Sequence, residues 1–148
     1  ASNFMWSCTM ALNGLISKGV PEDWSIHLIG HELTALFGID HARTLAIIAP
    51  SHYRYNFETK KDKLAQYAER VWHITEGTVD EKAEAAIVKT EEFLHSLDIN
   101  TKLSQYTDNY RGAAEGISKK FKDRNWLGIG ENQSITPQDV EEIIRMSY

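Results

Sequence analysis

The sequence predicts an all-α fold, organised as a single helical domain over residues 1–148. Apolar residues recur at helical spacing along most of the chain, and no segment alternates apolar and polar residues for long enough to form a convincing strand. No internal repeat divides the sequence. With 148 residues, 42% of them hydrophobic, the chain is long enough to bury one core, and we expect six to eight helices around it.

The first expected helix lies at the N-terminus and stops near Gly19, because glycine often ends helices. The residues that share its apolar face are Phe4, Cys8, Leu12, Leu15 and Ile16. Cys8 is the only cysteine, so the chain can form no internal disulfide. Its apolar surroundings predict a buried structural thiol, and a reducing, cytoplasmic compartment is expected.

Two further helices are expected before residue 60. The first runs from about Glu22 to Phe37 and ends at Gly38. The second runs from His41 to about Phe57, with Asp40 capping its start. Pro50 lies inside this second segment and should kink or end the helix.

The remainder of the chain contains four more helical patterns. Two of them have clean 3.6-residue periodicity, formed by Leu64, Tyr67, Ala68, Val71 and Trp72 and then by Val79, Ala83, Ile87, Leu94 and Leu97. Residues 106–123 form a weaker pattern that contains two internal glycines. The last helix should begin at Thr136, because a capping hydroxyl is followed by proline and then by an acid in the first turn.

The charge and hydropathy exclude two classes of partner. The net charge is −5 and lysine and arginine form no dense block, which argues against nucleic-acid binding. No apolar run reaches the roughly 18 residues that a membrane span requires. We therefore expect neither a nucleic acid nor a membrane among the partners.

Three of the six histidines lie within fifteen residues, at His27, His31 and His41. His27 and His31 are four apart on one helical face, and His41 follows the break at Gly38. Such a group can bring imidazoles to one point, and zinc or ferrous iron would suit them. The pattern is not that of the zincin metalloproteases, because Ala35 stands where their second histidine would be.

These residues alone leave alternatives open. The histidines could be structural parts of a stand-alone helical interaction module, or three ligands of a zinc hydrolase. His52, His73 and His95 have no motif around them and are expected to be ordinary helix residues.

The sequence segments around the histidines resemble those of the iron-containing (group III) alcohol dehydrogenase family. Within that family, the chain resembles the butanol dehydrogenase and NADPH-dependent aldehyde reductase subgroup. The matching segments are Asn13–Ile16, Gly19–Pro21, Asp23–Trp24, Asp40–Ala42, Thr44–Ile47, Gln66–Trp72 and Gly128–Asn132. The resemblance covers nearly all of the chain.

This resemblance implies a fold and roles for the histidines. The chain resembles the C-terminal helical metal-binding domain of a dehydroquinate synthase-like, iron-containing alcohol dehydrogenase fold. His27 and His41 match two metal ligands fourteen residues apart, and the metal would be Fe²⁺ or Zn²⁺. His31 matches a histidine near the nicotinamide and the substrate, and so becomes the candidate catalytic and cofactor-binding residue. The implied reaction is hydride transfer between NAD(P) and a small alcohol or aldehyde.

The resemblance also implies missing parts. The family's other two metal ligands, an Asp and a His, and its glycine-rich cofactor-binding domain have no counterpart in this chain. The chain starts at Ala1 without methionine, so we expect a piece of a longer enzyme whose N-terminal domain binds most of the NAD(P). Such a piece should be inactive alone, and it should associate with the missing domain and form a homo-oligomer.

Overall fold

The computed structural model describes all residues from 1 to 148 and contains seven α-helices and one short 3₁₀ helix. The helices are α1 (Ser2–Leu12), α2 (Ser25–Phe37), α3 (His41–Tyr55), α4 (Phe57–Val71), α5 (Val79–Ser96), η1 (Leu103–Gln105), α6 (Ala113–Asp123) and α7 (Pro137–Met146). The only β pairing is an isolated antiparallel bridge between Ile129 and Ile135. The all-α prediction is therefore confirmed. None of the helices combines the length and the hydrophobicity of a transmembrane span.

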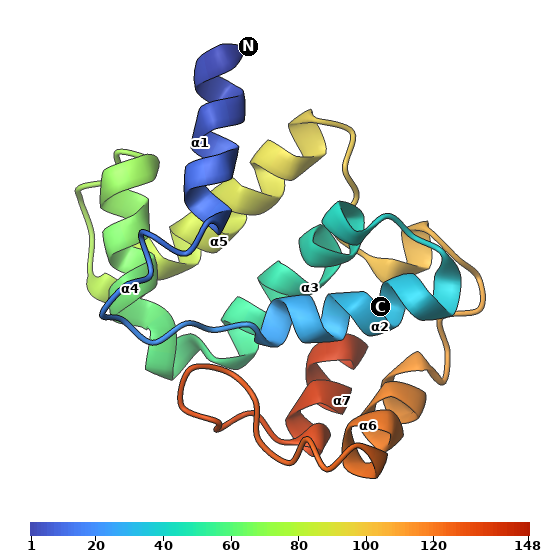
Figure 1. Ribbon diagram of the computed structural model, residues 1–148. Helices are drawn as coiled ribbons and strands as arrows, with labels where there is room; N and C mark the ends of the chain where they lie inside the picture. The colour runs from blue at the N-terminus through green and yellow to red at the C-terminus, as the bar shows by residue number, and fades with distance from the viewer.

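The helices form a main core and a smaller helix pair beside it. The main core comprises 15 buried residues, drawn chiefly from α2, α3, α6 and α7, with Leu33, Ile47, Ile117, Phe121 and Ile143 fully buried. In Figure 1, α4 and α5 lie side by side and run in roughly the same direction, because the connection between them returns along α4; the pair encloses a second cluster of Leu64, Ala83 and Ile87. Packing of each apolar face against another helix is what stabilises helices of this length.

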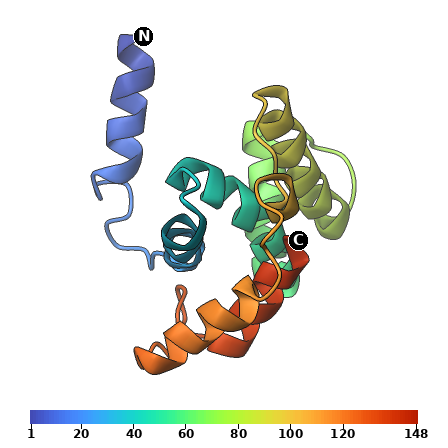
Figure 2. The same ribbon diagram turned by 90° about the vertical axis from the view of Figure 1, so that its right-hand side faces the viewer.

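Helix α1 differs from the other α-helices because it buries none of its residues. Figures 1 and 2 both show it projecting from the helical body, joined to α2 by a non-helical connection. Cys8 is exposed, so the expectation of a buried thiol was wrong. The cause is that no element of this chain packs on the face that carries it. The helix also ends at Leu12, well before Gly19, because the Asn13 side chain accepts a hydrogen bond from Leu15 N and starts a turn.

Several other helix features differ from expectation. Helix α3 continues through Pro50 to Tyr55, because residues on both sides of the proline, including Ile48 and His52, are packed in the core. Asp40 occupies the position before α3 but makes no capping hydrogen bond, and its carboxylate pairs with Arg43 at 3.5 Å. Helix α6 begins at Ala113, since Gly112 has a φ of +87° that a helix cannot include.

Two predicted helix termini are confirmed. Gly38 ends α2 in the left-handed conformation, with φ of 70°, and its N–H donates to Thr34 O at 2.9 Å. Thr136 and Asp139 cap α7 reciprocally, since each side chain accepts a hydrogen bond from the other's backbone N–H. The turn at Gly38 folds α3 back against α2, which brings the first residue of α3 near α2.

Candidate metal centre

The three clustered histidines converge at the α2–α3 crossing. One ligand atom from each of His27, His31 and His41 can be chosen so that all lie within 4.8 Å of one another. His27 and His31 come from successive turns of α2, and His41 is the first residue of α3. His27 and His41 are half-buried and His31 is exposed.

The nitrogen atoms of His27 and His41 are the closest pair in the cluster. His27 Nδ1 lies 3.2 Å from His41 Nε2, and the two ring planes are inclined by 57°. Two nitrogens bound at about 2.0–2.1 Å to one tetrahedral ion would be about 3.4 Å apart. The observed separation therefore fits two ligands of one ion, with little movement of either side chain.

His31 adopts a different relation to the cluster. Its ring stacks on that of His41, with centroids 4.0 Å apart and planes inclined by only 7°. The lone pair of an imidazole nitrogen lies in the ring plane, so two stacked rings direct their lone pairs along parallel planes instead of toward one point. This geometry disfavours one ion held by both His31 and His41 in the conformation observed.

Gly30 allows the two helices to approach closely enough for this site to form. A Cβ at residue 30 would lie 3.1 Å from Thr44 Oγ1 and 3.2 Å from Leu45 Cδ2, both on α3. It would also lie 3.5 Å from His41 Cε1. A glycine in the middle of a helix costs stability relative to alanine, and here it provides the space in which α3 lies against α2.

The Thr44 side chain contacts both the backbone and the ring of His41. Its hydroxyl is fully buried, donates to the backbone carbonyl of His41 at 2.8 Å and lies 3.4 Å from His41 Nδ1. Because the hydroxyl proton is used on the carbonyl, the oxygen can accept only from a protonated Nδ1. That tautomer leaves the Nε2 lone pair free on the side facing His27, as a metal ligand requires.

The surroundings favour neutral imidazoles at this site. Burial, followed by the neighbouring His31, lowers the pKa of His27. Burial, followed by His31 and His27, lowers the pKa of His41. Neutral imidazole is the form that binds metal ions, so these shifts reduce proton competition near neutral pH.

The beginning of α2 is held by a hydrogen-bonded network that the sequence did not reveal. Ser25 Oγ lies 2.7 Å from Nε2 of His52, and Asp23 accepts hydrogen bonds from the backbone and hydroxyl of Ser25. Lys60 donates to the same carboxylate at 2.7 Å. Burial would raise the pKa of Asp23, but the hydrogen bonds from Lys60 and Ser25 outweigh it and lower the pKa to about 2.

The remaining histidines lie away from the cluster. His52 belongs to α3 and is 1% exposed, so it is a core residue with a defined partner. His95 lies in the last turn of α5, 3.0 Å from Thr101 Oγ1. His73 follows the end of α4 with a φ of +57°, so the expectation that it is helical was wrong.

The sequence did not mark Ser25, Thr44 and Gly30 as parts of the site, because a lone small residue carries no periodic signal.

A helical domain with a histidine cluster at one helix crossing matches the C-terminal part of one oxidoreductase family. The model of the Fe-containing alcohol dehydrogenase family, C-terminal, matches residues 2–148, and the chain belongs to this family. The resemblance drawn from the sequence motifs is therefore confirmed.

Particular relatives place the chain within the family. It is 48% identical over 135 residues to the NADPH-dependent aldehyde reductase YqhD of Escherichia coli K12, covering 91% of this chain and 35% of the relative. It is 35% identical over 150 residues to NADH-dependent butanol dehydrogenase A of Clostridium acetobutylicum, covering 99% of this chain and 38% of the relative. The chain thus spans little more than a third of the length of these proteins.

Solved structures agree with the fold. A substrate- and cofactor-free form of the Escherichia coli aldehyde reductase YqhD superposes with a TM-score of 0.93 at 44% identity, over 99% of this chain and 38% of that one. The NADH-dependent butanol dehydrogenase A of Thermotoga maritima superposes with a TM-score of 0.80 at 22% identity, over 96% of this chain and 37% of that one. This second likeness supports the fold alone.

Proposed function

We propose that this chain is the metal-binding helical part of an NAD(P)-dependent alcohol dehydrogenase or aldehyde reductase. In this proposal, His27 and His41 supply two ligands to a divalent metal ion, Fe²⁺ or Zn²⁺, and His31 lies beside the substrate and the nicotinamide. The observation that carries the proposal is the 3.2 Å separation of His27 Nδ1 and His41 Nε2.

The residues of this chain would bind, orient and exchange a proton. When bound, the ion supplies Lewis-acid polarisation of the substrate oxygen, and the nicotinamide cofactor carries the hydride. His27 and His41 fix the ion against the α2–α3 crossing, while Thr44 orients His41. His31 is exposed at the edge of the cluster, where it can pass a proton between the substrate oxygen and solvent.

Two ligands are fewer than the three protein ligands of a typical catalytic zinc site, so we expect weak metal binding by this chain alone. We also expect no aldehyde reduction by the chain alone, because the relatives' remaining length would supply most of the cofactor site. Measurable turnover by the purified chain would overturn that expectation.

A Co²⁺ titration followed by visible absorption tests the ligand assignment. His27→Ala and His41→Ala should each weaken Co²⁺ binding at least about tenfold, whereas His31→Ala should change it less than about threefold. His73→Ala removes an exposed imidazole that makes no hydrogen bond and is the matched control. Metal analysis of the protein purified without added Co²⁺ then distinguishes iron from zinc.

The same titration separates the competing classes. A helical interaction module with structural histidines would bind no Co²⁺ at any of these residues. A three-histidine zinc hydrolase would lose binding equally in all three variants and would hold zinc tightly. The stacked rings of His31 and His41 favour the dehydrogenase assignment over the hydrolase.

A further inference from the structure

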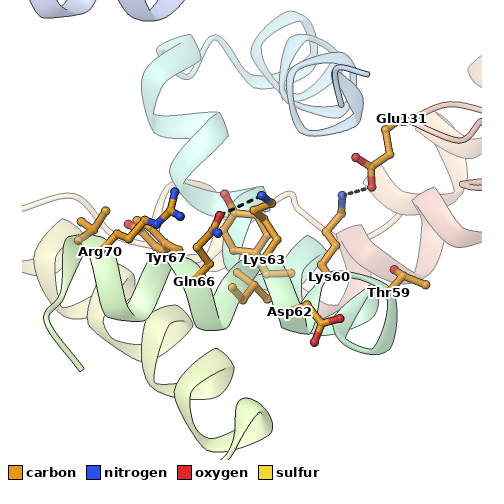
Figure 3. Close-up of a pocket in the computed structure, with 11 residues that line it drawn as sticks. Thr59, Lys60, Asp62, Lys63, Gln66, Tyr67, Arg70 and Glu131 are labelled. Atoms are coloured by element: carbon orange, nitrogen blue, oxygen red, sulfur yellow. Dashed lines mark hydrogen bonds and ion pairs between the residues drawn. The ribbon is translucent and has the colours of Figure 1, made fainter. Parts of the chain in front are cut away.

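A cavity of about 700 Å³ lies along α4, and none of the three clustered histidines lines it. Figure 3 shows the Lys60, Lys63, Gln66 and Arg70 side chains extending to the same side of the helix, while Asp62 points the other way. Positions 60, 63 and 70 recur at helical spacing, so one face of α4 presents the charged ends of Lys60, Lys63 and Arg70 to the cavity.

The positive charges of this cavity are only partly neutralised. Lys60 pairs with Asp23 at 2.7 Å and with Glu131 at 3.3 Å. Lys63 donates to the Gln66 amide oxygen at 2.9 Å and has no acidic partner. The Arg70 side chain makes no ion pair or hydrogen bond within the chain. In a chain of net charge −5, two cations without counter-ions thus line one cavity.

The other wall of the cavity is aromatic and apolar. Tyr53 from α3 joins Leu64, Tyr67 and Val71 of α4. Tyr67 Oη lies 3.2 Å from Thr90 Oγ1, whereas the hydroxyl of Tyr53 has no hydrogen-bond partner in the chain. Burial, followed by Tyr67, raises the pKa of Tyr53, so this phenol stays protonated as a donor.

We propose that this cavity binds a small organic anion, with its ring or hydrocarbon body against Tyr53, Leu64 and Tyr67. Its phosphate or carboxylate head lies near Lys63 and Arg70. The volume is within the range of pockets that hold ligands larger than an inorganic ion. Arginine recognises both oxyanions by bidentate hydrogen bonds, and the Tyr53 hydroxyl offers a further donor.

Lys60 has a different part in this site. Its two ion pairs connect the cavity to the segment before α2 and to the loop before α7, so it closes one end of the cavity. Burial would lower the pKa of Lys60, but the hydrogen bond and charge of Asp23, together with Glu131, raise it. The amine is therefore a structural cation, and the anion is left to Lys63 and Arg70.

Titrations with simple probes test this site, monitored by ¹H–¹⁵N chemical shifts of the 148-residue chain. 1-Naphthyl phosphate and 1-naphthoate carry the same ring with different heads, whereas 1-naphthol and inorganic phosphate are the separate body and head. We expect saturable binding of at least one naphthyl anion below about 1 mM, with shifts confined to residues of α3, α4 and the 128–135 loop. The preferred head identifies whether the site favours phosphates or carboxylates.

Matched variants make the result specific. Arg70→Gln should weaken binding of the preferred anion about tenfold, and Lys63→Gln about threefold. Arg111→Gln and Lys119→Gln remove the same charges from other surfaces and should leave the affinity unchanged. Tyr53→Phe should weaken binding of the anion, while the ¹H–¹⁵N spectrum of the free variant should remain that of a folded protein.

Three results would overturn the proposal. The first is the absence of saturable binding by either naphthyl anion. The second is equal weakening by the cavity variants and the control variants, which would mean non-specific attraction. The third is equal binding of 1-naphthol and the anions, which would leave no role for Lys63 and Arg70. None of these outcomes bears on metal binding by His27 and His41.

Discussion

Helices α1 and α2 are neighbours in sequence and are both short and apolar, yet only α2 is packed. Helix α2 buries Ile29 and Leu33 completely and lies against α3 and α6. Helix α1 buries nothing, and Phe4 and Trp6 are 73% and 66% exposed. An apolar face predicts that something will cover it, but not whether the cover belongs to the same chain.

The difference also shows what builds the histidine site. Gly30 lets α3 approach α2, and Gly38 turns the chain so that His41 returns to His27. Helix α1 has no such close approach and carries no convergent group. The functional chemistry thus lies on the helix whose backbone is fixed by its neighbours, as precise ligand placement requires.

The largest expected effect is a direct test of this contrast. Ile29→Ala should lower the free energy of unfolding by about 2–5 kcal/mol, because it removes fully buried methyl groups and leaves a cavity. Leu12→Ala in α1, where the side chain is 69% exposed, should change it by less than about 0.5 kcal/mol. Urea unfolding measures both. Equal losses in the two variants would mean that α1 is packed in solution.

The second prediction concerns how acid loosens the attachment of α2. Burial lowers the pKa of His52 to about 4, against 6.5 in the unfolded chain; Asp23 opposes this shift and Lys60 adds to it, both with smaller effects. Between pH 6.5 and pH 4, His52 is therefore protonated in the unfolded state but neutral in the folded state. The free energy of unfolding should fall by up to about 3 kcal/mol as the pH drops from 6.5 to 4.

Urea unfolding at a series of pH values measures this dependence, and His52→Gln should make it shallower. His27 and His41, whose pKa values are also lowered, contribute in the same direction in both proteins. Below pH 4 the loss should continue through Asp23, whose carboxylate is protonated near pH 2 when folded and near 3.8 when unfolded. An unchanged pH dependence in His52→Gln would contradict the assignment.

These contrasts show which parts of the molecule the sequence could predict. The fold class, the end of α2 at Gly38 and the cap of α7 at Thr136 rest on local signals and agree with the structure. The exposure of Cys8 depends on a neighbour that the pattern cannot name. The continuation of α3 through Pro50 depends on tertiary packing that overrides local preference.

The histidine cluster was predictable only in part. The resemblance to the iron-containing alcohol dehydrogenases marked His27 and His41 as the pair, and the structure brings their nitrogen atoms together. The stacking of His31 on His41 and the support from Thr44 could not be predicted, because both depend on the crossing of α2 and α3. A threonine three residues after a histidine is too common a pattern to single out.

The third prediction narrows the contrast to the helix crossing itself. Gly30→Ala places a Cβ 3.1 Å from Thr44 Oγ1, so α3 must shift by a few tenths of an ångström. The gain in helix propensity, up to about 1 kcal/mol, should offset much of the loss in the free energy of unfolding that this strain causes. Co²⁺ binding should nevertheless weaken about tenfold, because ligand geometry tolerates little displacement. Gly116→Ala on α6, where a Cβ meets nothing, is the control. Unchanged Co²⁺ affinity would show that the crossing does not set the ligand positions.

The smallest expected effect on stability belongs to α1, and it concerns association. Phe4, Met5 and Trp6 project from a helix that nothing in the chain covers, and exposed apolar patches of this kind drive association. We therefore expect the chain to self-associate through α1 at high concentration. The double variant Phe4→Ser, Trp6→Ser should shift light scattering toward the monomer while changing the free energy of unfolding by less than about 0.5 kcal/mol. Leu127→Ser removes an exposed side chain from the loop before α7 and should leave association unchanged. If the unmodified chain stays monomeric at about 1 mM, α1 does not mediate association, and its apolar face has some other cover.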